Sequence, residues 1–155
     1  MAVEIERRFV VDRLPDTLVL DEGTPMRQGY LTEGGAVAVR VRITATTAVL
    51  TVKAGSGMAR TEVEVPLPLD EAEQLWPHTA GGRIDKTRHH VPLADGADAD
   101  LDRYHDTLEG LVTVEVEFPD VAAAERFAPP AWFGTEVTGR PEWSNAALAR
   151  HGRPS

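Results

Sequence analysis

The sequence predicts an α+β fold dominated by β-structure: a closed eight-stranded antiparallel barrel with a few short flanking helices. Most of the 155 residues alternate between apolar and polar side chains with a period of two, which is typical of strands. Clusters of Gly, Pro, Asp and Thr separate these runs, and helical segments are few. A sheet of many evenly spaced strands avoids exposed edges by closing on itself, so we expect a barrel.

Eight alternating runs account for the predicted strands. The connections at residues 31–36 and 53–58 are typical of tight hairpins, because their glycines adopt the positive φ angles that such turns require. Neighbouring strands are therefore expected to be antiparallel. In chain order, the predicted strands are residues 3–11, 26–32, 36–44, 48–54, 59–66, 83–92, 99–105 and 110–118.

Three short helices are expected outside the sheet, each beginning at a residue that commonly caps helices. The chain shows no internal repeat, low-complexity tract or linker, and its length suits one hydrophobic core. Residues 1–155 are therefore predicted to form a single domain. The predicted caps and helices are Asp70 before residues 71–76, Asp120 before 121–127, and Ser144 before 145–151.

Composition excludes several classes of function. The 25 acidic residues outnumber the 16 Lys and Arg, and the net charge of −9 argues against nucleic acid or an anionic membrane as a partner. The absence of Cys excludes disulfides and Cys-ligated zinc. No apolar run approaches the roughly 18 residues of a membrane span, and the charged N-terminus is unlike a signal peptide. We expect a cytoplasmic protein.

Charged residues gather on one face of the predicted strands. For a single strand, a solvated face with cross-strand ion pairs explains the pattern. Here, however, most of the strands concerned are either acidic or basic at these positions. If the sheet closes, this face lines an interior that must hold water, ions or a charged ligand, because unpaired buried charges are costly. The positions are Glu4, Glu6, Arg8, Arg40, Arg42, Lys53, Glu62, Glu64, Lys86, Arg88, Asp100, Asp102, Glu115 and Glu117.

These side chains suit a metal-chelated polyphosphate. Clustered carboxylates without His or Cys are the ligands that Mg²⁺ or Mn²⁺ prefers. Guanidinium groups bind phosphate oxygens in a bidentate manner. The two lysines of the chain, Lys53 and Lys86, both lie on the charged faces, where a titratable ammonium differs chemically from a guanidinium.

The same residues resemble the CYTH domains, or triphosphate tunnel metalloenzymes. EIERRF at residues 4–9 is similar to the N-terminal ExExK signature of that family, with Arg8 in place of the signature lysine. The resemblance covers nearly the whole chain and is strongest to short bacterial members that hydrolyse inorganic tripolyphosphate. It continues through QGYL (28–31), VRVR (39–42), TVKAG (51–55), RTEVEVPL (60–67), KTR (86–88), LDRYHDTLEGL (101–111), VEVEF (114–118) and EVTGRPEWSNAALA (136–149).

The resemblance implies an eight-stranded tunnel that hydrolyses a triphosphate to pyrophosphate and phosphate with Mg²⁺ or Mn²⁺. It implies a small-molecule triphosphate as partner, and we expect a monomer or homodimer. Lys86, near the attacked phosphorus, would act with Glu4 and Glu6 in catalysis. The implied metal ligands are Glu4, Glu6, Glu62, Glu64, Asp102, Glu115 and Glu117, and the implied triphosphate-binding residues are Arg8, Arg40, Arg42, Lys53 and Arg88.

Several alternatives remain open at this point. Thiamine triphosphatases and class IV adenylate cyclases share these motifs, and a non-catalytic polyphosphate- or nucleotide-binding module would use similar cations. Aromatic residues would either read an organic group at the tunnel mouths or pack beneath helices. A lipocalin-like barrel for an apolar ligand conflicts with the charged faces. The helix over 145–151 would cover one end of the tunnel or serve only in packing. The aromatic candidates are Tyr30, Tyr104, Trp132 and Trp143.

Overall fold

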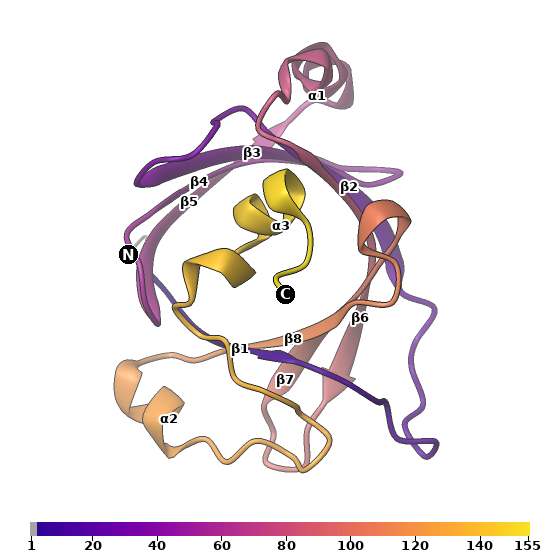
Figure 1. The fold of residues 1–155 in the computed structure, drawn as a ribbon, viewed down its shortest axis with the longest axis vertical. Coiled ribbons are helices and arrows are strands. Elements are labelled where there is room, and N and C mark those ends of the chain that lie inside the picture. The colour runs from indigo at the N-terminus through magenta and orange to yellow at the C-terminus, as the bar shows by residue number, and fades with distance from the viewer. Residues whose placement is uncertain (1–2) are drawn as a thin grey trace.

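The computed structural model describes residues 3–155, and its strands form the predicted closed antiparallel barrel (Figure 1). The strands are β1 (Val3–Val10), β2 (Thr24–Tyr30), β3 (Val37–Ile43), β4 (Ala48–Ala54), β5 (Ala59–Leu67), β6 (Arg83–Pro92), β7 (Asp98–Tyr104) and β8 (Val112–Glu117). Around the barrel they follow the order β1-β5-β4-β3-β2-β6-β7-β8, and pairing of β1 with β8 closes the ring.

The helices are short and connect or follow the strands. Two predicted caps are confirmed: Asp120 accepts a hydrogen bond from Ala123 N at 2.7 Å, and Ser144 accepts one from Ala147 N at 3.1 Å. The predicted cap at Asp70 is wrong. The helices are α1 (Leu69–Leu75), α2 (Val121–Arg126) and α3 (Asn145–His151), with 3₁₀ turns η1 (Trp76–His78), η2 (Asp106–Leu108) and η3 (Pro141–Trp143).

The wrong cap has a local cause. The helix α1 begins one residue before Asp70, so that Asp70 lies in its first turn and Pro68 occupies the cap position. Among the described residues, no side chain caps this helix. The fixed φ angle of Pro68 determines the direction in which the chain enters the helix. The acidic side chains of the first turn still interact favourably with the positive N-terminal end of the helix dipole.

Most apolar side chains of the strands pack on the outside of the barrel, and an inward-facing group with Val10, Ile84 and Tyr104 packs against α3. Phe9 on β1, Leu101 on β7 and Val114 on β8 are almost fully buried beneath the segment 12–22 and the region that contains α2. A second apolar cluster joins β3 and β4 to α1 through Val41. Because the alternating charged positions then point inward, the barrel interior is polar, which confirms the prediction drawn from the charged faces.

Arg7 lies on the otherwise apolar outer face of β1 and has partners there. Its guanidinium donates to both carboxylate oxygens of Glu136, at 2.8 and 2.7 Å, and to the carbonyl oxygens of Ala124 and Phe127, at 3.0 and 2.9 Å. It therefore ties the end of α2 and the chain around Glu136 to the barrel wall.

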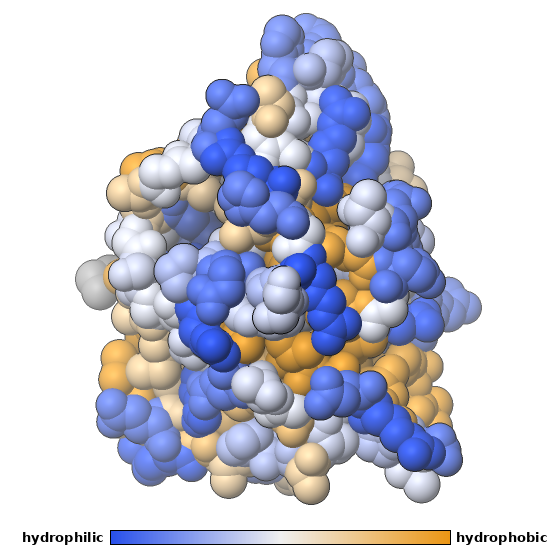
Figure 2. Space-filling model, viewed as in Figure 1, coloured by the Kyte–Doolittle hydropathy of each residue, from blue (hydrophilic) through white to orange (hydrophobic). Residues whose placement is uncertain are grey.

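The face of the molecule that carries α3 is mostly hydrophilic (Figure 2). Orange, apolar side chains show in the depressions between the blue ones. Within residues 3–155, no helix is long and apolar enough to cross a membrane.

Candidate active site

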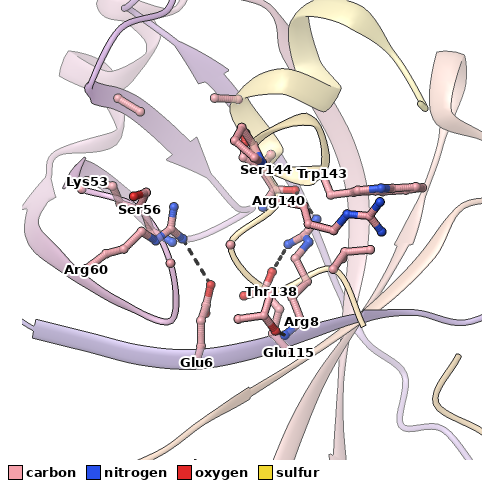
Figure 3. A pocket seen from close by; sticks show the side chains of 18 of the residues that line it. Glu6, Arg8, Lys53, Ser56, Arg60, Glu115, Thr138, Arg140, Trp143 and Ser144 are labelled. Carbon is pink, nitrogen blue, oxygen red and sulfur yellow. Dashed lines mark hydrogen bonds and ion pairs between the residues drawn. The ribbon is translucent and has the colours of Figure 1, made fainter. Parts of the chain in front are cut away.

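A cavity of about 220 Å³ opens between the barrel interior and the C-terminal segment (Figure 3). Glu6 and Arg8 reach it from β1, Arg40 from β3, Lys53 from β4 and Glu115 from β8. The glycine-containing hairpins and residues of the C-terminal segment form the rest of its wall, including Gly35, Ser56, Thr138, Arg140, Trp143 and Asn145. Strands that are distant in sequence therefore bring both signs of charge into one chamber.

Three carboxylates gather at one side of the barrel interior. Each of Glu4, Glu6 and Glu117 offers an oxygen, and these oxygens lie within 4.8 Å of one another. The register explains the grouping, because Glu6 pairs with Glu117 across β1 and β8, and Glu4 is two residues away on the same face. An oxygen-only set of this kind fits a hard divalent cation such as Mg²⁺ or Mn²⁺.

Burial and mutual repulsion disfavour the charged forms of the three clustered carboxylates. Burial raises the pKa of Glu6 well above its ordinary value, and the nearby charge of Glu115 adds to this effect. Burial likewise raises the pKa values of Glu4 and Glu117. Lys53 Nζ lies 3.1 Å from Glu4 and offsets part of the repulsion. The site therefore favours occupation by positive charge.

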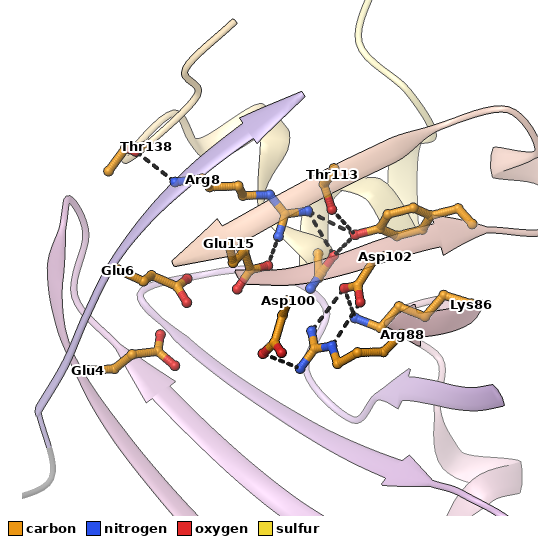
Figure 4. Close-up of polar contacts among 12 residues, drawn as sticks. Glu4, Glu6, Arg8, Lys86, Arg88, Asp100, Asp102, Thr113, Glu115 and Thr138 are labelled. Carbon is orange, nitrogen blue, oxygen red and sulfur yellow. Dashed lines mark hydrogen bonds and ion pairs between the residues drawn. The ribbon is translucent and has the colours of Figure 1, made fainter. Parts of the chain in front are cut away.

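Arg8 lies at the centre of a second buried group (Figure 4). Its guanidinium pairs with Glu115, which faces it across β1 and β8. Its Nη2 donates to Tyr104 Oη and to Asn145 Oδ1, both at 3.0 Å. Although burial opposes ionisation of Glu115, the charge of Arg8 holds the pKa of this carboxyl well below its ordinary value.

Lys86, Asp102 and Arg88 form a third group. The side chain of Lys86 is 0% exposed, and its Nζ donates to Asp102 Oδ2 at 2.7 Å. Arg88 donates to both oxygens of Asp102, at 2.8 and 2.9 Å, and also lies 3.4 Å from Asp100. Burial lowers the pKa of Lys86 to about 7, although the carboxylate of Asp102 opposes this shift. The cations in turn keep the pKa of Asp102 low despite its burial.

The remaining predicted residues lie along β3, β4 and β5. Glu62 is 3.3 Å from Lys53, and Glu64 is 3.6 Å from Arg42. Arg40 is buried, and its Nε has no hydrogen-bond partner within residues 3–155. This N–H is therefore available to a ligand of the cavity, because a buried donor without a partner is costly.

The predicted site residues are not all brought to one point. In the described chain, the three-carboxylate group comprises Glu4, Glu6 and Glu117. The other predicted metal ligands lie outside this group and each contact a cation of the protein, as Glu4 and Glu6 also do. The residues in that second class are Glu62, Glu64, Asp102 and Glu115.

Sequence reasoning missed Arg60 and Asn145. Arg60 Nη2 lies 3.3 Å from Glu6 and 3.7 Å from Glu4, and Arg60 lines the cavity. The alternation that selected Glu62 also places Arg60 on the inner face, so the signal was present in the sequence. Asn145 carries no comparable signal, because it reaches the cavity from a helix outside the sheet.

Fold and site together define a tunnel-type β-barrel with a binding chamber for a metal-associated polyanion. Over 147 residues the chain is 42% identical to the inorganic triphosphatase of Nitrosomonas europaea, covering 94% of this chain and 96% of that protein. The chain belongs to the triphosphate tunnel metalloenzyme, or CYTH, family. No family model matches it.

Solved structures agree with this assignment. A crystal structure of an inorganic triphosphatase, 39% identical, superimposes with a TM-score of 0.71 and covers 99% of both chains. An adenylyl cyclase candidate from Hippeastrum with a dominant triphosphatase activity is 14% identical and gives a TM-score of 0.63, covering 100% of this chain and 98% of that one. The second likeness concerns the fold alone.

Proposed function

We propose that the protein hydrolyses inorganic tripolyphosphate to pyrophosphate and phosphate in the presence of Mg²⁺ or Mn²⁺. The observation that carries this proposal is the chamber in which Arg8, Arg40 and Lys53 converge beside the Glu4, Glu6 and Glu117 carboxylates. The near full-length relative named inorganic triphosphatase supports the choice of substrate. The cavity, of about 220 Å³, suits a small polyanion.

Glu4, Glu6 and Glu117 would hold the divalent cation. When bound, the cation would neutralise phosphoryl oxygens and help to place the attacking water. Lys53 and Arg60 contact Glu4 and Glu6 and would supply further positive charge beside the substrate. The remaining predicted ligands stay candidates for a second cation, namely Glu62, Glu64, Asp102 and Glu115.

The basic residues would bind the triphosphate and stabilise its leaving group. Arg8, Arg40 and Lys53 line the chamber, and Arg42 and Arg88 extend the same inner face. Hydrolysis separates pyrophosphate from phosphate, and negative charge develops on the oxygen that leaves. Fixed guanidinium groups stabilise that charge without reorganisation at the moment of reaction, so catalysis consists mostly of placement and electrostatics.

Lys86 is proposed to orient the attacking water or the attacked phosphoryl group. Its ammonium is fully buried and directed by Asp102. We expect Lys86→Ala to lower turnover at least tenfold more than it lowers metal affinity, because the cation site lies on other strands. Steady-state kinetics and metal titration of the same variant check this. Equal losses in turnover and in metal affinity would argue against this role.

The test of the activity is phosphate release from tripolyphosphate, pyrophosphate, ATP and thiamine triphosphate, each with Mg²⁺, Mn²⁺ or EDTA. We expect release from tripolyphosphate with metal and none with EDTA.

Arg40→Ala should raise KM at least tenfold, whereas Arg13→Ala, on an exposed side chain, is the matched control and should change nothing. Tight binding of tripolyphosphate without any release would favour the binding module, and preferential turnover of ATP or thiamine triphosphate would favour the other family activities.

A further inference from the structure

The C-terminal helix delivers a polar side chain into the chamber. Ser144 caps α3 and thereby sets the position of Asn145, the first residue of the helix. Leu148, one turn later, is 1% exposed and anchors the helix in an apolar cluster with Ile84 and Tyr104. Because Leu148 anchors α3, the packing of this helix defines the position of Asn145, which lines the cavity.

The carbonyl oxygen of Asn145 is fully used by the protein. Tyr104 Oη donates to Asn145 Oδ1 at 2.7 Å, and Arg8 Nη2 donates to the same atom at 3.0 Å. Arg8 is a donor only, so a rotated amide would place its NH₂ group against a guanidinium. The orientation of the amide is therefore determined by its partners.

The other half of the amide has no such partner. Within residues 3–155, no acceptor lies in hydrogen-bond geometry with Asn145 Nδ2. In the same chamber, Arg8 Nε and Arg40 Nε are buried and have no hydrogen-bond partner within the described chain, whereas Asn145 is partly exposed. Three donors around one chamber thus lack an acceptor from the protein, and an anion with many oxygens is the ligand that would satisfy all of them.

We propose that Asn145 is a triphosphate-binding residue supplied by the C-terminal helix: its carbonyl holds Arg8 in place while its amide N–H donates to a phosphoryl oxygen. This inference rests on the proposed function, since it names a further contact of the same site. It also explains why position 8 tolerates arginine. The planar fork of Arg8 needs more acceptors than a lysine would, and Asn145 provides one of them.

Two variants separate binding from support of the fold. Asn145→Ala removes both functions of the amide. Asn145→Asp keeps an oxygen for Arg8 and Tyr104, replaces the N–H donor with a second acceptor oxygen and adds a negative charge, so its structure should be retained while its contact with a phosphoryl oxygen is lost. Glu125→Gln is the control, because Glu125 is an exposed residue of α2 that does not line the chamber.

Calorimetric titration of the full chain with tripolyphosphate in EDTA measures binding without turnover. We expect Kd to rise about tenfold to a hundredfold in both Asn145 variants, as the loss of a hydrogen bond to a charged group predicts. We expect the melting temperature of Asn145→Asp and the Kd of Glu125→Gln to stay at wild-type values. A Kd within twofold of wild type in Asn145→Asp overturns the proposal, even if Asn145→Ala fails to fold.

The same titration keeps this inference distinct from the proposed function. If the wild type binds tripolyphosphate but never hydrolyses it, the proposed function fails, whereas a raised Kd in the Asn145 variants still supports the contact. If the wild type hydrolyses tripolyphosphate and both variants bind it normally, the function stands and the contact is wrong.

Discussion

Single residues in the chamber owe their roles to the partners that surround them. Arg8 is buried, and its interactions with Glu115, Tyr104 and Asn145 offset the cost of burying the charged guanidinium. Its backbone N–H is also satisfied, by Thr138 Oγ1 at 2.9 Å. A residue with this many partners contributes both to binding and to stability.

Restoring the signature lysine should therefore be costly in this chain. We expect Arg8→Lys to lower the free energy of unfolding by about 1–3 kcal/mol, because an ammonium cannot reach all three acceptors and one buried group loses its partner. Urea unfolding followed by circular dichroism measures the change. Arg13→Lys, on an exposed side chain, should stay within about 0.5 kcal/mol of wild type. A fully stable Arg8→Lys protein would contradict the role given to these contacts.

The Arg7–Glu136 pair should make stability depend on pH. The hydrogen bonds from Arg7 hold the pKa of Glu136 below its ordinary value of 4.5. A carboxyl with a lowered folded-state pKa stabilises the protein above its unfolded pKa, and this contribution is lost as the pH falls through the folded value. Glu136→Gln should cost up to about 1 kcal/mol at pH 7, and the difference from wild type should shrink below pH 4.5. Chemical unfolding across this range is the measurement, and a difference that is constant with pH would refute the assignment.

At the scale of elements, the helix α3 has more importance than its length suggests. It packs against β6 and its first residue lines the chamber, so it links the C-terminus of the chain to the inner face of the barrel. In Figure 1 it lies across the opening of the ring of strands. Its stability comes from tertiary packing, because a helix of this length is marginal by itself.

Weakening that packing should affect both stability and binding. We expect Leu148→Ala to lower the free energy of unfolding by about 2–4 kcal/mol, as for other buried leucines, and to raise the Kd for tripolyphosphate. Val121→Ala, at a partly exposed position of α2, should change stability by less than about 0.5 kcal/mol and leave binding unchanged. Thermal unfolding and calorimetry report the two effects. Unaltered binding in a destabilised Leu148→Ala protein would separate α3 from the site.

In the whole molecule, most apolar packing lies outside the ring of strands and the charged side chains lie inside it. Two apolar clusters lie between the wall and the segments that cover it, and a third lies beneath α3 at one end of the barrel, while the rest of the interior concentrates charge. A closed ring of strands can hold like charges near one another because every strand is bonded on both sides. The burial of apolar side chains on the outer face thus offsets the free-energy cost of grouping charges in the interior.

Ligands of opposite charge should then stabilise the whole fold. Saturating Mg²⁺ with tripolyphosphate should raise the free energy of unfolding by about 2.7 kcal/mol at a hundredfold excess over Kd. Glu6→Gln should keep or improve stability in EDTA, because burial already favours the neutral form, and should lose most of the response to metal. Glu33→Gln, in an exposed hairpin, is the control. Thermal shift with and without EDTA checks this, and a full metal response in Glu6→Gln would contradict the carboxylate site.

Much of the fold and of the site followed from local pattern. Alternation with a period of two assigns each residue of a strand to one of two faces, so the inward charges from Glu4 to Glu117 could be named without knowledge of the pairing. Arg60 follows the same rule and could have been included. The predicted cap at Asp70 was wrong because Pro68 occupies the cap position of α1. Both residues are acceptable helix starts, and composition alone does not distinguish them.

The sequence by itself determined which faces carry charge, that the sheet closes, and which family the chain resembles. Only the tertiary structure decided which charges meet. Register across β1 and β8 groups Glu4, Glu6 and Glu117, and the packing of α3 brings Asn145 to Arg8 over a separation of 137 residues. Such contacts depend on the relative placement of distant elements, and no local period of side chains encodes that placement.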